Sequence, residues 1–369
     1  MEQSSISMKQ LFILMYLFEI GSAIVVGLGV SAKQDAWIAT LLGMAGGLII
    51  FLIYGYLHIQ YPAAPLTTYI QLLLGKYIGF PVALIYILYF FYIATRVLRD
   101  CAELLISSAF DETPLLAVIT IMMVVISIAL YHGIEVIGRT SEIIFGAVIF
   151  MTAITGILIL SSDIVRLEKL LPILEGGWKP VLKTAFPLTF TFPFGETVVF
   201  TMLLPYVHKK QAAVKTGLAA ITASGIALAL TMVLNISVLG VTRLSIEQFP
   251  LLNTIGKINV GMFIQRLDAI ALSALIIGGF FKILIFYYAA LFGIRDLFSI
   301  KKKKSTLYML SIFTPAIIAY SIAMSESFSE HIEVGLKQVP YYFHLPLQVG
   351  LPVLLFIVAF IKKQMQSSS

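Results

Sequence analysis

The stretch TFTFPFGETVVF, from Thr189 to Phe200, lies inside a long apolar segment and contains a proline, a glycine and a carboxylate within four residues. Proline removes a backbone donor and clashes with the preceding helical turn, and glycine costs little to unwind. The sequence therefore predicts a membrane helix that is interrupted at Pro193 to Gly195. Backbone groups freed at that depth need partners in a cavity or a ligand. A simple kink is the alternative.

The composition is that of an integral membrane protein. Hydrophobic residues make up 59% of the 369 and charged residues only 12%, and the mean hydropathy is +0.98. A soluble domain could not bury so many apolar side chains. We therefore expect one all-α polytopic membrane domain over residues 1–369. The lone cysteine, Cys101, cannot form an internal disulfide, and we interpret it as a small buried apolar residue.

Ten apolar segments are long enough to cross a bilayer core of about 30 Å. They lie near residues 9–29, 36–58, 79–106, 115–132, 140–161, 184–205, 213–240, 267–293, 306–323 and 343–361. If the N-terminus is inside, many lysines and arginines fall in short inside loops, while the outside ones are spread over longer loops. This asymmetry predicts that both termini are cytoplasmic.

The first segment carries a second irregularity, EIGSAIVVGLG at residues 19–29, with Gly21 and Ser22 near its middle. Close packing of small residues is one explanation. The other follows from position, because the first and sixth segments hold corresponding places in two halves of five. Two interrupted helices at such places predict an inverted repeat, about 9–161 and 184–361, around a substrate site near the midplane.

Several ionisable residues lie deep inside the predicted spans, where they are costly unless they face a partner or water. The residues concerned are Arg96, Arg99, Asp100, Glu103, Glu196 and Lys282. Arg96 and Asp100 are four residues apart and can meet on one helix face. The same spacing relates Arg99 to Glu103. These pairs either neutralise each other or form a wall or gate of a ligand cavity.

Glu196 and Lys282 each allow more than one role. Glu196 follows the break directly, so it caps the second half of the helix, pairs with a cation or binds a ligand ammonium. Lys282 lies about midway along the eighth segment. Its ammonium either stands in for a bound sodium ion, forms a structural ion pair, or extends along its stem to water.

Five motifs are distributed over nearly the whole chain. They are FPFGETVVFTMLLPYVHKK at 192–210, RDCAE at 99–103, HGIEVIGR at 132–139, LLPILEGGWKP at 170–180 and IQRLDAI at 264–270. Together they resemble the B-subunit of GerA-type spore germinant receptors, which are spore permeases of the amino acid/polyamine/organocation superfamily. The resemblance implies a LeuT-like fold with broken helices 1 and 6, in the inner membrane of a bacterial endospore. It also implies a nutrient germinant as ligand, and a membrane-embedded A-subunit and a lipoprotein C-subunit as partners.

The same resemblance indicates the ligand-binding residues. It places the first break at Ile20, Gly21, Ser22 and Ala23 and the sixth at Phe192, Pro193, Phe194, Gly195 and Glu196. An amino acid suits this site physically. The second half of the first helix would begin with unpaired amides facing a carboxylate. The first half of the sixth would end with free carbonyls around Thr191 and Phe192, which accept from an ammonium.

Two functions of different class fit these features. One is a receptor subunit in which germinant binding shifts a bistable domain and passes the change to a partner. The other is an amino acid or proton-coupled permease that transports its ligand, since fold alone does not decide function. The sequence shows no nucleophile with a matching base, metal-ligand spacing or phosphate loop. We therefore expect no enzyme activity, cofactor, metal or nucleic-acid partner.

Overall fold

The computed structural model describes residues 5–24, 26–207, 209–257, 267–300, 302 and 304–367, and within these ranges the chain forms helices and turns and no strand. The α-helices are α1 (Met8–Ile20), α2 (Ala36–Gln60), α3 (Leu66–Ser108), α4 (Leu115–His132), α5 (Ile134–Ser161), α6 (Trp178–Thr184), α7 (Lys210–Leu239), α8 (Val241–Leu244), α9 (Pro250–Ile255), α10 (Leu267–Leu297), α11 (Lys304–Ala323), α12 (Phe328–Lys337) and α13 (Leu351–Ser367). The 3-10 and π segments are η1 (Val30–Asp35), η2 (Leu167–Leu170), η3 (Ala185–Thr189), η4 (Phe194–Met202), η5 (Leu204–Tyr206) and η6 (Pro340–Gly350). Residues 264–266 of the IQRLDAI motif lie outside the described residues.

Eight helices within the described ranges are long and apolar enough to cross a membrane. They cover eight of the ten predicted segments. The remaining two, 9–29 and 184–205, are interrupted and so contain no continuous helix of that length. α3 begins well before the predicted residue 79, because Gly75, at φ 78°, joins a short first helix to the spanning part.

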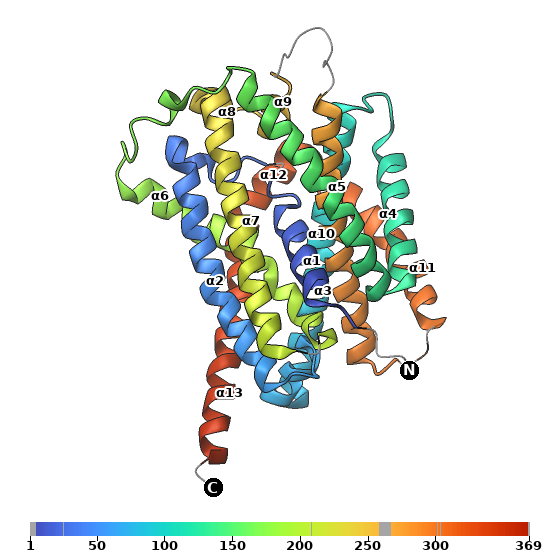
Figure 1. The fold of residues 1–369 in the computed structure, drawn as a ribbon. Helices are drawn as coiled ribbons and strands as arrows, with labels where there is room; N and C mark the ends of the chain where they lie inside the picture. The colour runs from blue at the N-terminus through green and yellow to red at the C-terminus, as the bar shows by residue number, and fades with distance from the viewer. Residues whose placement is uncertain are drawn as a thin grey trace.

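The helices pack around α1, which lies inside the bundle. α3 and α10 run side by side and α7 packs against both α1 and α2, while α4, α5 and α11 lie towards one side and α6 and α13 towards the other (Figure 1). The interrupted first segment is thus surrounded by protein. Irregular backbone at membrane depth is tolerated only in such a place.

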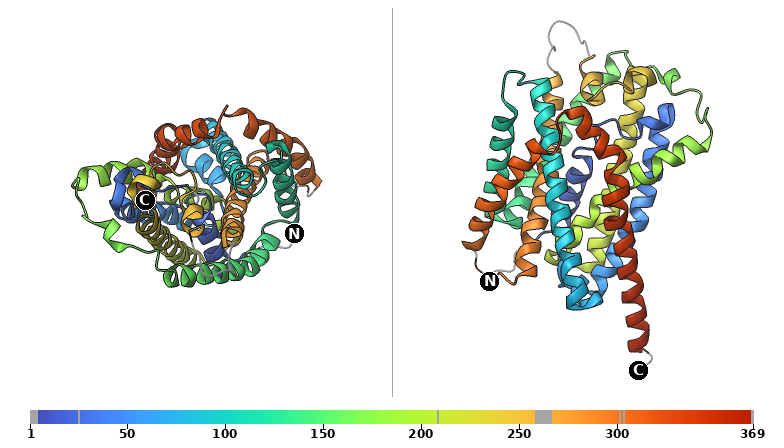
Figure 2. Two further views of the ribbon diagram at one scale, coloured as in Figure 1. Left: turned by 90° about the horizontal axis from the view of Figure 1, so that it is seen from above. Right: turned by 180° about the vertical axis from the view of Figure 1, so that it is seen from behind.

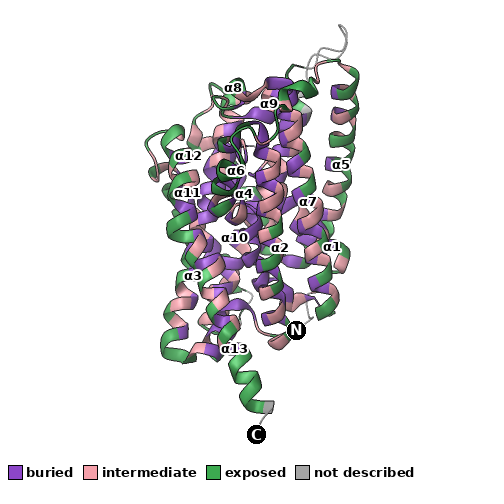
Figure 3. Cartoon of the chain, turned by 90° about the vertical axis from the view of Figure 1, so that its left-hand side faces the viewer, coloured by how far each residue is buried: buried purple, intermediate pink, exposed green. Residues whose placement is uncertain are grey.

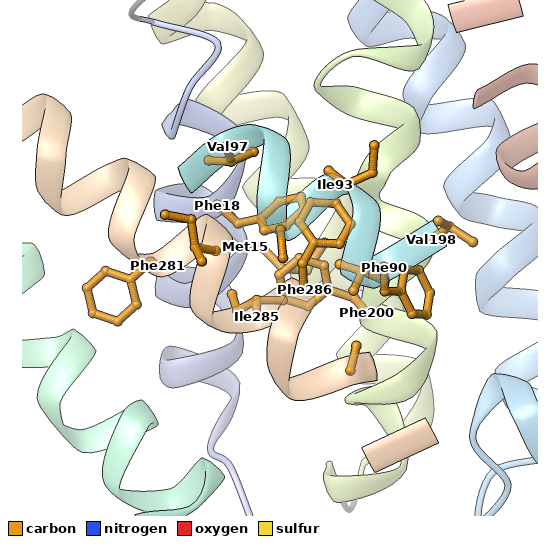
Figure 4. Close-up of a cluster of buried hydrophobic side chains, with 14 of the residues drawn as sticks. Met15, Phe18, Phe90, Ile93, Val97, Val198, Phe200, Phe281, Ile285 and Phe286 are labelled. Atoms are coloured by element: carbon orange, nitrogen blue, oxygen red, sulfur yellow. The ribbon is translucent and has the colours of Figure 1, made fainter. Parts of the chain in front are cut away.

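The core between these helices is rich in aromatic side chains (Figure 4). The ring of Phe18 lies 5.1 Å from that of Phe200 and 5.0 Å from that of Phe286, and all three side chains are fully buried. Offset and edge-to-face aromatic pairs add about 0.5–1.5 kcal/mol beyond their burial. These contacts hold α1 against η4 and α10, so the two interrupted segments share one core.

Exposed residues cover much of the outside of the bundle (Figure 3), and many of them are large and apolar. On α5 alone, Ile143 is 79% and Leu160 77% exposed. A surface this apolar is stable in hydrocarbon and not in water. The chain is therefore a multi-pass membrane protein.

The two ends of the described chain lie at the same end of the bundle, and α13 extends beyond it there (Figures 1 and 2). This placement agrees with termini on one side of the membrane. That this side is the cytoplasm stays a prediction.

Candidate functional site

The first helix breaks where the sequence predicts it. α1 ends at Ile20, and Gly21 has φ 5° and ψ −120°, outside the helical region. A Cβ on Gly21 would lie 2.7 Å from the Phe18 carbonyl oxygen and 2.9 Å from Cδ of Lys282. Glycine is therefore required for the chain to turn here against α10.

The expected second half of this helix is not formed, and that prediction is wrong. Residues 21–24 and 26–29 are turns, and helical structure resumes only at η1. Gly27 and Gly29, the latter at φ 76°, lower the helix propensity of this stretch. Among the described residues, the first segment therefore presents no helix N-terminus directly after its break. The amides of Ser22 and Ala23 nevertheless donate no backbone hydrogen bond within the described part of the chain.

The sixth segment is also interrupted, slightly earlier than predicted. Helical backbone continues through residue 191, Phe192 and Pro193 form a turn, and η4 begins at Phe194. Pro193 restricts the residue before it and cannot donate, so the first half ends ahead of it. Gly195 lies within η4 and does not unwind the helix. Glycine is needed there for close packing, because a Cβ would lie 2.2 Å from Oε1 of Gln348.

Glu196 and Lys282 form a buried ion pair. Lys282 Nζ lies 2.5 Å from Glu196 Oε2, and the side chains are 0% and 2% exposed. The ammonium also lies 5.1 Å from the ring centroid of Phe18 and 4.6 Å from that of Phe192, which is the geometry of cation–π attraction. Of the alternatives, extension of Lys282 to water is wrong because the side chain is buried, and capping by Glu196 is wrong because η4 has no side-chain cap.

Glu19 is a further site residue that the sequence reasoning missed. It is fully buried at the end of α1, and neither carboxyl oxygen has a hydrogen-bond partner among the described residues. It is close enough to Lys282 and Glu196 to interact with their charges. The signal was present in the sequence, because a carboxylate two residues before Gly21 is as exceptional inside a span as Glu196.

The two breaks meet at a small, partly open space that we call the central cavity. Its lining comprises Ser22, Val26, Ile93, Arg96, Val97, Asp100, Phe192, Glu196, Ile332, Gly335, Leu336, Val339 and His344. The volume is about 50 Å³, which is room for a few water molecules. Ser22 Oγ is buried and has no hydrogen-bond partner in the described chain. The cavity therefore presents an unused hydroxyl.

A polar network supports the cavity from η6. Tyr89 Oη lies 2.7 Å from His344 Nδ1, and the Gln348 side-chain amide donates to both, at 2.8 Å and 3.0 Å. Because an amide nitrogen only donates, His344 Nδ1 accepts and its ring proton lies on Nε2. Tyr54 Oη donates to the Gln348 carbonyl at 2.5 Å. The network fixes η6 against α2 and α3, and the sequence carried no local signal for it.

Arg96 and Asp100 do not pair with each other as predicted. Arg96 Nη2 donates to the His331 carbonyl at 2.5 Å, and Asp100 Oδ1 lies 2.9 Å from His331 Nε2. Gly335 lies directly on Arg96, since a Cβ there would be 2.4 Å from Nη2. Both charged residues reach α12, which packs over them, and Arg96 also donates to Tyr92 Oη of its own helix at 3.4 Å. They hold α12 across the central cavity, and we call these contacts the α12 clamp.

Arg99 and Glu103 do form the predicted pair, with Arg99 Nε 2.8 Å from Glu103 Oε1. Arg99 Nη1 also donates to the carbonyls of Ser321 and Ile322, at 3.2 Å and 3.3 Å. The pair therefore ties α3 to the end of α11. Neither residue lines the central cavity.

The predicted ligand residues divide into two groups. Ser22, Phe192 and Glu196 line the central cavity, as does Arg96 from the predicted gating set. The others lie behind the lining or elsewhere: Ile20, Gly21, Ala23, Thr191, Pro193, Phe194 and Gly195. Thr191, for example, is buried and donates to the Pro187 carbonyl within its own helix.

The central cavity combines donors with acceptors. Arg96, the Ser22 hydroxyl and His344 Nε2 donate, while Glu196 and Asp100 accept. Such a lining can hold a small polar molecule that carries both donor and acceptor groups. The described residues contain no group of three or more His, Cys, Asp and Glu that could hold a metal ion.

The architecture matches that of two solved transporters. One is MhsT in complex with L-phenylalanine, with a TM-score of 0.64 at 13% identity, covering 96% of this chain and 98% of that one. The other is Mhp1, a nucleobase-cation-symport-1 family transporter in a closed conformation with bromovinylhydantoin bound, with a TM-score of 0.61 at 14% identity, covering 97% and 90%. At these identities the likeness shows the fold alone, which is the LeuT-like fold with broken helices 1 and 6.

Sequence comparison identifies the family within that class. Residues 5–329 match the family described as spore germination protein. The chain is 42% identical to spore germination protein KB of Bacillus subtilis (strain 168) over 369 residues, covering 100% of this chain and 98% of that one. It is 28% identical to spore germination protein YndE of the same organism over 287 residues, covering 75% and 76%. The chain belongs to the spore germination protein family.

Proposed function

We propose that this protein is the germinant-binding B-subunit of a spore germination receptor, and that its ligand is a small nutrient molecule, most simply an amino acid. Family membership supports the role in germination. The architecture supports a ligand at the meeting point of the two breaks. MhsT, of the same fold, was solved with an amino acid bound.

The observation that carries the proposal is the central cavity with its unused Ser22 hydroxyl. A buried polar atom without a partner costs about 1–3 kcal/mol. A ligand that hydrogen-bonds to Ser22 Oγ would remove that cost. An ammonium next to Glu196 and a carboxylate next to His344 Nε2 would complete the recognition of a zwitterion.

Binding would be coupled to a change of shape, because the cavity of about 50 Å³ is smaller than most amino acids need. The ligand would favour a state in which the walls have moved apart, and thereby shift the population towards it. α12 forms one wall and is held by side chains of α3, so it is the element we expect to move.

We further propose that the change passes to partner subunits, a membrane-embedded A-subunit and a lipoprotein C-subunit, in the inner membrane of the spore. The apolar outer surface leaves room for a membrane-embedded partner. The cytoplasmic location of both termini belongs to the same proposal.

The experiment is a germination dose–response over a panel of amino acids and sugars, in spores carrying the unchanged chain, Ser22→Ala or Glu196→Gln. Loss of one hydrogen bond of about 1 kcal/mol would raise the half-maximal ligand concentration roughly fivefold for Ser22→Ala. Glu142→Gln is the matched control, since Glu142 pairs with Lys9 at the surface, at 2.6 Å. A dose–response of both site variants identical to that of the control would refute the site.

An amino acid permease is the second candidate, favoured by the likeness to two transporters. Vesicles that contain this chain alone and accumulate a labelled amino acid would support it. Binding without accumulation, together with a germination response that requires the partner subunits, would support the receptor.

A further inference from the structure

A second, partly open space borders the first break at Ile20 and Ile24, and we call it the lateral cavity. Its walls come from α5, α7, α9, α10 and the end of α1, and they include Ile20, Ile24, Thr155, Gly156, Thr231 and Leu275. The volume is about 150 Å³, three times that of the central cavity. None of the described side chains that line it is charged.

Three threonines line the lateral cavity among the described residues, and the hydroxyls of the two that are not exposed are already engaged. Thr155 donates to the Met151 carbonyl and Thr231 to the Ala227 carbonyl, each at 2.9 Å within its own helix. An ordered water needs two to four polar partners, and apolar cavities of this size stay dry and take up apolar molecules. The apolar walls therefore favour a hydrocarbon as the ligand of the lateral cavity.

The position of the cavity indicates where the hydrocarbon comes from. α5 forms one wall, and its other face is exposed and apolar, with Phe150 66% and Ile157 65% exposed. In a membrane protein that face meets the bilayer. Thr152, on the same helix, both lines the cavity and is exposed, so the cavity borders the lipid.

We propose that the lateral cavity binds the hydrocarbon end of a membrane lipid chain. An inserted chain contacts Ile20 and Ile24, which flank the first break on either side of Ser22. The lateral cavity therefore differs from the central cavity in its ligand and shares no lining residue with it. It contacts the same interrupted segment from the bilayer side.

Glycines of α5 provide a matched pair of variants. Gly156 lines the cavity, and a Cβ placed there meets no atom within 4 Å. The first atom of a new side chain at Gly156 therefore enters open space, and Gly156→Leu is the variant chosen to fill the cavity. A Cβ on Gly146 likewise meets no atom within 4 Å, but Gly146 is exposed on the outside and lines neither cavity.

The experiment uses the full chain in phosphatidylcholine vesicles in which a fraction of the lipid carries a photoactivatable acyl chain. After illumination, adducts are mapped by mass spectrometry. We expect adducts on Ile20 and Ile24 in the unchanged protein, their loss in Gly156→Leu, and their retention in Gly146→Leu. Adducts on the outward Phe150 should be equal in all three.

Ala274→Leu fills the cavity from α10 and provides a second test if Gly156→Leu does not fold. Adducts confined to outward-facing residues would overturn the proposal. So would adducts on Ile20 and Ile24 that persist at the same level in the filled variants. Because lipid contact is measured without a germinant, this result does not depend on whether the proposed function is correct.

Discussion

Lys282 Nζ lies 2.5 Å from Glu196 Oε2, with both side chains buried, although the two residues lie on different helical segments far apart in the sequence. The pair joins α10 to the segment that follows the sixth break. Its position between Phe18 and Phe192 makes the ammonium part of the aromatic core. The stability of the core and the geometry of the central cavity therefore depend on the same charges.

Removing one member of this pair should be strongly destabilising. Lys282→Met leaves Glu196 buried without its partner, and a broken buried ion pair costs about 3–5 kcal/mol. The double variant Lys282→Met with Glu196→Gln should recover most of this loss, because neither member of the pair is then left charged without its partner. Thermal unfolding in detergent measures both. Additive effects of the two substitutions would contradict the expected coupling.

Weakening the α12 clamp should open the central cavity. Asp100→Asn removes the charge opposite His331, which lies 2.9 Å away. In a Cys101→Ala background, a cysteine introduced at Ser22 reports access, and its labelling by a small thiol reagent should become faster. Glu333→Gln is the control on the same helix, because the exposed Lys337–Glu333 pair contributes little. Equal labelling rates in both variants would show that the clamp does not close the cavity.

The glycines of α2 should be intolerant of side chains. A Cβ on Gly43 would lie 2.6 Å from the backbone of Thr189, and one on Gly47 would lie 2.3 Å from Cβ of Phe194. Gly43→Ala should therefore cost about 1–3 kcal/mol by overpacking. Gly146→Ala, in open space on α5, should instead stabilise the protein by about 0.5–1 kcal/mol. Melting temperatures of the two variants that change in the same direction would be inconsistent with this packing.

Replacing Glu19 by an apolar residue should stabilise the protein. Neither carboxyl oxygen of Glu19 has a hydrogen-bond partner within the described residues. A buried polar group without a partner costs about 1–3 kcal/mol, and Glu19→Leu removes this cost. Glu103→Leu should have the opposite effect, because the Glu103 carboxylate pairs with Arg99 at 2.8 Å. Denaturation of the two variants under the same conditions shows whether each substitution raises or lowers the free energy of unfolding. A loss of stability in Glu19→Leu would mean that its carboxylate has a stabilising partner in the membrane.

Much of the fold followed from local sequence features. Spans of the required length predicted the membrane-embedded helices, and Gly21 and Pro193 predicted both breaks. These predictions succeed because hydropathy and backbone conformation depend on neighbours along the chain. The Arg99–Glu103 pair was predictable for the same reason, since residues four apart meet on any helix.

Tertiary structure alone decided how these elements combine into a site. The spacing that correctly paired Arg99 with Glu103 failed for Arg96 and Asp100, because α12 packs over them and His331 offers each of them a partner. The same holds for the Lys282–Glu196 pair and for the turn after Gly21. The sequence by itself determined a membrane bundle with two interrupted helices. Which charged groups meet inside it was decided by the packing of distant helices, because in a low-dielectric interior a charge is stable only where the fold brings a partner to it.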